Sequence, residues 1–199
     1  MISRRFLVLI CVALSACNRA TPAASGQNES SLRRIDLGGQ TVVMDSGQSL
    51  DSIAAEFGAP IFRNTYAPED ELRACIEVTH RGAARRLHLI TNDLGGPKHH
   101  VMGYTVTAES EPSCVIPSIP LKLVTARLLY VGLAWEGSKK LLDNTPNSSA
   151  DSLVYFWSVQ RLDSSQGASP RRYDEFTRVV VRVRDGLLRE FTVWYGEVN

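Results

Sequence analysis

The chain has 199 residues, of which 44% are hydrophobic, and it carries 22 basic and 21 acidic side chains. This composition supports a folded core and excludes a chain that stays disordered because it lacks apolar residues. The formal charge of +1 provides no broad electrostatic attraction for nucleic acid, so we expect no nucleic-acid partner.

The N-terminus has the charge and hydropathy pattern of a secretory signal. Two arginines precede an apolar run over residues 6–13, which is too short to span a bilayer because a spanning helix needs about 20 residues. The sequence Leu14-Ser15-Ala16-Cys17 follows and resembles the bacterial lipobox. This resemblance implies that residues 1–16 are a lipoprotein signal peptide and that Cys17 carries the lipid. The alternative is a plain secreted protein in which Cys17 is incidental.

Residues 17–32 are predicted to be a flexible tether between the lipid and the fold. The segment from Asn18 reads NRATPAASGQ, which is small and polar and buries too little surface to order itself. Because Asn rather than Asp follows Cys17, we expect anchoring in the outer membrane rather than the inner membrane, facing the periplasm. Removal of residues 1–16 takes away two arginines and no acid, which leaves a formal charge of −1.

The rest of the chain is predicted to form two similar units, over residues 33–112 and 113–199. In the first unit, the segment Ser46–Pro60 predicts a short amphipathic helix, because Ser49 can cap its start and Gly58 can end it in the left-handed conformation. We predict that an antiparallel meander of three strands follows, over Leu72–His80, Arg85–Thr91 and His100–Ala108.

The second unit repeats this order. A second helix is predicted over Val131–Pro146, although Ala134 stands where the first helix has its capping serine. Asp185-Gly186 predicts a two-residue hairpin turn. The three strands expected here are Ser152–Leu162, Phe176–Arg184 and Leu187–Gly196. The predicted fold class is therefore α+β: a tandem repeat of a short helix followed by a three-stranded antiparallel meander, with the helices packed on one face of the sheet.

Cys75 and Cys114 are the cysteines that remain if Cys11 leaves with the signal and Cys17 is lipidated. An even pair in an oxidising compartment predicts a disulfide. The alternative is a catalytic Cys75 assisted by His80, which a second cysteine in the periplasm argues against.

The pattern Gly47-x-Ser49-x₃-Ile53-x₃-Phe57-Gly58-x-Pro60, followed by a meander, resembles the repeat of the β-lactamase inhibitor protein. The small outer-membrane assembly lipoproteins of the BamE (SmpA/OmlA) type share that layout. The resemblance is weaker over the second unit. The resemblance to these two groups implies a fold with helices on one face of the sheet and an open opposite face that binds proteins. It also implies no enzymatic activity. Its matching residues are structural, so they indicate a fold rather than a function.

Arginine and aromatic residues alternate with valines along the last strands and predict a basic, aromatic sheet face. The candidate partner-binding residues are Trp157, Arg182, Arg184 and Trp194, because arginine and aromatic side chains dominate the energetics of protein interfaces. The alternative is an ordinary solvated sheet face with a cation–π contact.

No motif for a catalytic nucleophile, a phosphate-binding loop or a zinc protease is present, so we expect no catalytic residue and no enzyme. The four histidines, His80, His88, His99 and His100, do not favour a metal site by their positions, and we expect no metal and no cofactor. Two functions remain open. One is a lipid-anchored protein of envelope assembly or maintenance that binds an unknown protein, and the other is a periplasmic inhibitor or immunity protein.

Overall fold

The computed structural model describes residues 31–44, 46–64, 71–92, 98–125, 129–136, 142, 146–149, 152–163 and 171–198. These residues contain eleven strands and one α-helix longer than a single turn. The elements are β1 (Arg34–Leu37), β2 (Gln40–Val43), α2 (Leu50–Phe57), β3 (Ile61–Asn64), β4 (Glu71–His80), β5 (Ala83–Thr91), β6 (Gly103–Thr107), β7 (Leu121–Thr125), β8 (Asn147–Ser149), β9 (Ser152–Asp163), β10 (Arg171–Arg184) and β11 (Leu187–Val198).

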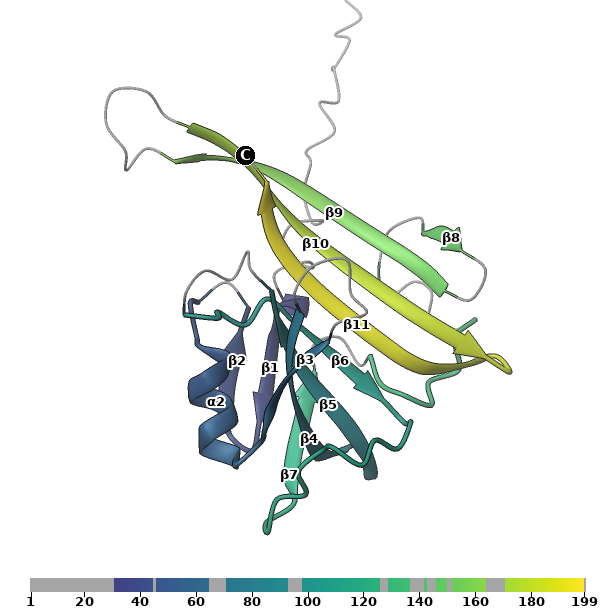
Figure 1. The fold of residues 1–199 in the computed structure, drawn as a ribbon. Helices are drawn as coiled ribbons and strands as arrows, with labels where there is room; N and C mark the ends of the chain where they lie inside the picture. Colours follow the sequence, from purple (N-terminus) through teal and green to yellow (C-terminus); the bar gives the residue numbers. More distant parts are fainter. Residues whose placement is uncertain are drawn as a thin grey trace, which may run out of the picture.

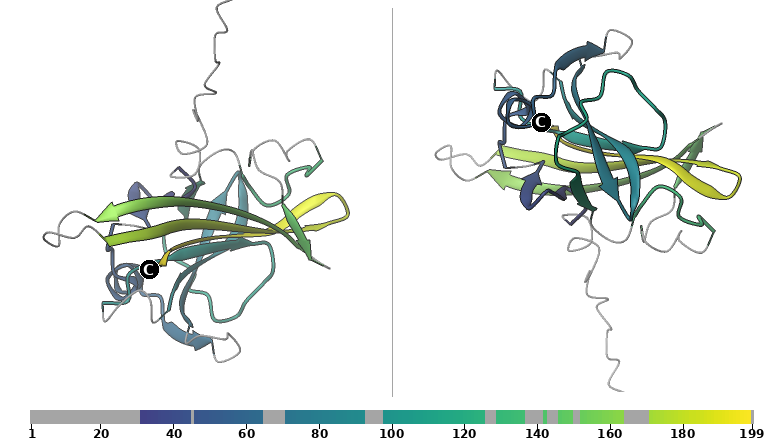
Figure 2. Two further views of the ribbon diagram at one scale, coloured as in Figure 1. Left: turned by 90° about the horizontal axis from the view of Figure 1, so that it is seen from above. Right: turned by 90° about the horizontal axis from the view of Figure 1, so that it is seen from below.

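All eleven strands belong to one mixed sheet. Its order is β2-β1-β7-β4-β5-β6-β11-β10-β9-β8, and β3 pairs with β4 beside this path. Neighbouring strands are antiparallel except β4 and β7, which are parallel. Figures 1 and 2 show the sheet strongly twisted, with the long strands β9–β11 forming one arm and β4–β7 the other.

The predicted fold class is therefore wrong. The two meanders, β4-β5-β6 and β9-β10-β11, exist, but β6 pairs with β11 and joins them edge to edge. Edge strands carry unpaired backbone groups, and pairing β6 with β11 satisfies both edges at once. β7 also pairs with β1 and β4, so strand pairing crosses the predicted boundary between residues 112 and 113.

One hydrophobic core serves both arms of the sheet. Alternate residues of β11, including Phe191 and Val193, are fully buried on one face, and they pack with Tyr104 of β6. Leu32, just before β1, and Ile35 of β1 belong to the same cluster, although β1 lies near the opposite end of the sheet order from β9–β11. Burial of apolar side chains from both arms in one cluster explains why the meanders do not form separate units.

The segment before β1 is held against the core. Leu32 is 1% exposed, and its carbonyl accepts a hydrogen bond of 3.1 Å from the hydroxyl of Tyr104. The predicted tether, residues 17–32, therefore includes a residue that belongs to the fold. Leu32 is apolar, and it is buried in the core beside Tyr104 of β6. The rest of that segment, residues 17–30, lies outside the described residues, as does the signal over residues 1–16.

The first helix was predicted correctly. In α2 the Ser49 side chain accepts a hydrogen bond from the amide of Ser52, and Gly58 follows with a φ of 65°. Leu50, Ile53 and Ala54 are buried, which places the apolar face of the helix against the sheet. Local capping and periodicity were sufficient to define this element.

The second predicted helix, over Val131–Pro146, is wrong at its N-terminal end. Ala134 forms a β-bridge with Leu187, and the amide of Trp135 donates to the carbonyl of Gly186 at 2.9 Å. Trp135 is 2% exposed and packs edge-on against Tyr155. A turn at residues 131–132 followed by the bridge at Ala134 places this indole in the core and adds hydrogen bonds to Leu188 of β11, whereas Ala134 offers no helix cap. Residues 137–141 and 143–145 lie outside the described part of the chain.

Candidate functional site

The outer face of β9–β11, the side of these strands turned away from the core, carries arginine and aromatic side chains. Cross-strand pairing places Gly103, Trp194, Arg178 and Phe156 in one row across β6, β11, β10 and β9. In the neighbouring row Phe176 pairs with Gly196. Arg178 therefore lies between two aromatic residues on adjacent strands.

The aromatic rings of this face lie over glycines. A Cβ atom at Gly103 would approach the indole of Trp194 to 2.8 Å, and one at Gly196 would approach the ring of Phe176 to 2.4 Å. Rings that cover glycines stabilise the strands by filling the space that a side chain would occupy. Phe156 stacks on Phe176 with ring centroids 5.7 Å apart and remains 49% exposed. Phe156 thus presents apolar surface to solvent.

The arginines of the outer face differ in their pairing. Arg182 forms an ion pair of 3.1 Å with Glu190. Arg178 and Arg184 are exposed, and neither forms a side-chain ion pair or hydrogen bond in the described part of the chain. A guanidinium forms paired hydrogen bonds with a carboxylate, and these two side chains are exposed and able to do so.

The structure places the four predicted partner-binding residues on two faces. Arg182, Arg184 and Trp194 share the outer face, as the alternation predicted. Trp157 lies on the opposite face, because it pairs with buried Thr177, stacks on Tyr155 and packs against the core. The alternation of side chains along β9 does not show which of its two faces is buried. The pairing of β9 with β10 was needed to assign Trp157 to the inner face.

The alternation with valines groups Arg178 with Arg182 and Arg184, but Arg178 was not among the predicted partner-binding residues, and Phe156 and Phe176 were missed as members of this face. Arg178 alternates with Val179 in the same way as Arg182, so the hairpin pattern contained that signal. The position of Phe156 depends on the register between β9 and β10, and the connection between those strands is too long for a turn rule to define it.

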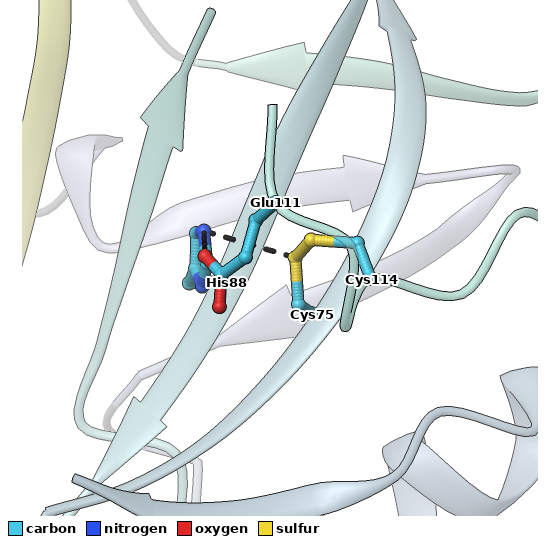
Figure 3. Close-up of side chains that lie close together, drawn as sticks. All are labelled: Cys75, His88, Glu111 and Cys114. Carbon is cyan, nitrogen blue, oxygen red and sulfur yellow. Dashed lines mark hydrogen bonds and ion pairs between the residues drawn. A yellow bond between two sulfur atoms is a disulfide. The ribbon is translucent and has the colours of Figure 1, made fainter. Parts of the chain in front are cut away.

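A second group of side chains gathers where β4 and β5 meet the loop after β6. The structure joins Cys75 and Cys114 as a disulfide with Cα atoms 4.5 Å apart, as predicted from the cysteine count. His88 pairs with Cys75 across the strands, and its Nε2 lies 3.7 Å from the Cys75 sulfur and 3.3 Å from Oε2 of Glu111 (Figure 3). We call Cys75, His88, Glu111 and Cys114 the thiol cluster.

The two members of the thiol cluster that lie on β4 and β5 are screened from water. Cys75 is 0% exposed and His88 is 3% exposed, and burial lowers the pKa of His88, which the Glu111 carboxylate partly opposes. A catalytic thiol would need access to substrate and an unblocked sulfur, whereas the Cys75 sulfur is buried and bonded to Cys114. His88, rather than the predicted alternative partner His80, is the histidine beside Cys75.

His80 instead lines a separate surface pocket of about 470 Å³, together with Arg81, Lys122 and Thr125. Its Nε2 lies 3.3 Å from the Thr125 hydroxyl. Burial lowers the pKa of His80 to about 4, and Arg81 and Arg85 lower it further by repulsion of the imidazolium. His80 is therefore neutral at pH 7, and none of the described residues lining this pocket is an acidic or thiol nucleophile.

No protein family, curated protein or solved structure matches the chain. The fold implied by the resemblance to the β-lactamase inhibitor protein and to the BamE-type lipoproteins is not the fold observed. Among the described residues, no helix has the length and apolar character required to cross a bilayer. The candidate lipidation residue Cys17 lies outside the described residues.

Proposed function

We propose that this chain is a non-catalytic, lipid-anchored protein of the bacterial cell envelope that binds an acidic protein partner through the outer face of β9–β11. The observation that carries the proposal is the exposed Arg178 side chain beside the exposed ring of Phe156, with Arg184 exposed further along the same face of β10. Neither arginine forms a side-chain ion pair among the described residues. The lipobox-like sequence ending at Cys17 supports the anchor.

Arginine and aromatic side chains suit such a face for a physical reason. A guanidinium forms paired, charge-assisted hydrogen bonds with a carboxylate, and an aromatic ring buries a large apolar area with little loss of side-chain entropy. Arg178 lies between Trp194 and Phe156, so a partner carboxylate bound to it would be flanked by apolar surface. Exclusion of water at that point would strengthen the ion pair.

Charge reversal on this face tests the proposal. The full-length protein in mild detergent serves as bait for native envelope extracts, beside the variant Arg178→Glu/Arg184→Glu. Since neither arginine supports the fold through an ion pair within the described residues, we expect the variant to fold normally and to lose the captured partner by at least about tenfold.

Arg34→Glu is the matched control, because Arg34 is an exposed strand arginine outside the outer face of β9–β11. This control should retain the partner at the wild-type level. Capture of the same proteins, in the same amounts, by wild type and the double variant would contradict the proposed face. A single stoichiometric enzyme that withstands high salt and is inactive in the complex would identify an inhibitor. Several components released together by salt would identify an assembly scaffold.

The anchor is tested separately by Cys17→Ala. Lipid transfer requires the cysteine thiol, so we expect the variant to lose fatty-acid labelling completely and to accumulate as unprocessed precursor. Metabolic labelling followed by immunoprecipitation checks this result, with Cys11→Ala as the control that should still be labelled. Lipid label on the Cys17→Ala protein would exclude Cys17 as the anchor.

A further inference from the structure

The thiol cluster combines four side chains that metal ions use as ligands. Two of them, Cys75 and His88, are cross-strand neighbours in the middle of β4 and β5, so the sheet fixes their separation. The other two, Glu111 and Cys114, lie in one turn of the loop after β6, where the amide of Cys114 donates to the carbonyl of Glu111 at 3.2 Å. Two ligands held by the sheet, Cys75 and His88, thus lie beside two ligands from a single turn, Glu111 and Cys114.

The distances within the cluster are close to those of a tetrahedral site. One donor atom from each side chain can be chosen so that all four lie within 4.8 Å of one another. Zinc binds nitrogen and oxygen at about 2.0 Å and sulfur at about 2.3 Å, which places neighbouring donors roughly 3.3–3.8 Å apart in a tetrahedron. The His88–Glu111 distance of 3.3 Å and the Cys75–His88 distance of 3.7 Å already fall in this range. The two bonded sulfurs must separate before both can bind one metal ion.

Burial and charge also fit a cation at this position. Nε2 of His88 is directed at Cys75 and Glu111 (Figure 3). Its Nδ1 is buried and has no hydrogen-bond partner among the described residues. Two thiolates and one carboxylate would concentrate three negative charges there. A divalent cation would neutralise most of that charge, and Arg73 and Arg86 lie near enough to act electrostatically on His88.

We propose that Cys75, His88, Glu111 and Cys114 form a closed zinc site when the disulfide is reduced. A dithiol reductant transfers two electrons and two protons to the Cys75–Cys114 bond, which gives two thiols and the reductant's own disulfide. Zinc then displaces both thiol protons and binds two thiolates, Nε2 of His88 and a carboxylate oxygen of Glu111. Two sulfurs, one imidazole and one carboxylate are a ligand set suited to Zn²⁺. The disulfide and the metal are alternative cross-links between β4 and the same loop.

The test is a zinc titration of the full-length protein, with and without a phosphine reductant, in competition with a chromophoric chelator. We expect the reduced protein to bind one zinc per chain and the oxidised protein to bind none at this site. His88→Ala and Glu111→Gln should each weaken binding to the reduced protein by at least about tenfold. His99→Ala and Glu109→Gln are the controls, since neither residue belongs to the cluster, and they should bind zinc as the wild type does.

Cobalt substitution provides a second readout that reports the ligands themselves. Reduced protein with Co²⁺ should show tetrahedral ligand-field absorption and a thiolate-to-cobalt charge-transfer band, and Cys114→Ala should lose intensity in that band. If reduction alone unfolds the chain, zinc should restore the native circular dichroism spectrum, because binding then drives folding. Equal zinc binding by oxidised and reduced protein, no binding by reduced protein, or no effect of His88→Ala would each overturn the proposal.

Discussion

Replacing Arg33 with methionine is expected to lower the free energy of unfolding by about 3 kcal/mol, at the lower end of the range for breaking a buried ion pair. The Arg33 side chain is 5% exposed and reaches across the core to β10. Its Nε donates to the Thr177 hydroxyl at 2.8 Å, one terminal nitrogen contacts Glu175 at 3.2 Å, and its guanidinium lies 4.4 Å from the ring centre of Tyr195. The substitution leaves a largely buried Glu175 with only the more exposed Arg161 as its remaining ion-pair partner in the described residues.

Urea denaturation measures this effect through the transition midpoint at constant slope. Arg34→Met is the matched control, because the neighbouring arginine is exposed, and it should change stability by less than about 0.5 kcal/mol. The double variant Arg33→Met/Glu175→Gln should be more stable than Arg33→Met, since it removes the uncompensated carboxylate. A midpoint of Arg33→Met equal to that of wild type would show that this pair does not hold the segment before β1 in place.

Removing the disulfide with Cys75→Ala/Cys114→Ala is expected to destabilise the protein by about 4 kcal/mol. The two cysteines are 39 residues apart, and the chain-entropy relation gives about that value for a closed loop of this length. The cross-link ties the loop after β6 to the middle of β4, where Val115 also exchanges backbone hydrogen bonds with Cys75 and Glu77. The loss should appear in thermal and urea unfolding measured without added metal.

Chemical reduction distinguishes the stability that comes from the disulfide bond from the stability that comes from packing of the two cysteine side chains. Wild-type protein unfolded in the presence of reductant and a chelator should match the double alanine variant within about 1 kcal/mol, because both lack the closed loop. Ser113→Ala, next to Cys114, is the control and should keep nearly the stability of oxidised wild type. If oxidised wild type and the double variant unfold at the same denaturant concentration, the disulfide contributes nothing to stability.

Part of the thiol cluster was accessible to sequence reasoning. The turn at Arg81-Gly82 pairs His80 with Ala83, and counting outward along the hairpin brings Cys75 opposite His88. The hairpin pattern therefore contained this contact, although the spacing of the histidines alone did not favour a metal site. The cysteine count predicted Cys114 beside Cys75. The position of Glu111 was not predictable, because the loop after β6 has no regular structure that defines where it crosses β4.

Elements whose hydrogen bonds close within a few residues follow from the local sequence. The caps of α2 at Ser49 and Gly58 and the hairpin turn at Asp185-Gly186 depend only on neighbouring residues, and both were predicted correctly. Tertiary structure alone decided which strand edges meet. The pairing of β6 with β11, the β-bridge of Ala134 with Leu187 and the hydrogen bond from Arg33 to Thr177 of β10 join residues far apart in the chain. Such contacts form because they bury apolar surface and pair the backbone groups of strand edges at the same time. No local sequence pattern indicates which edges will pair.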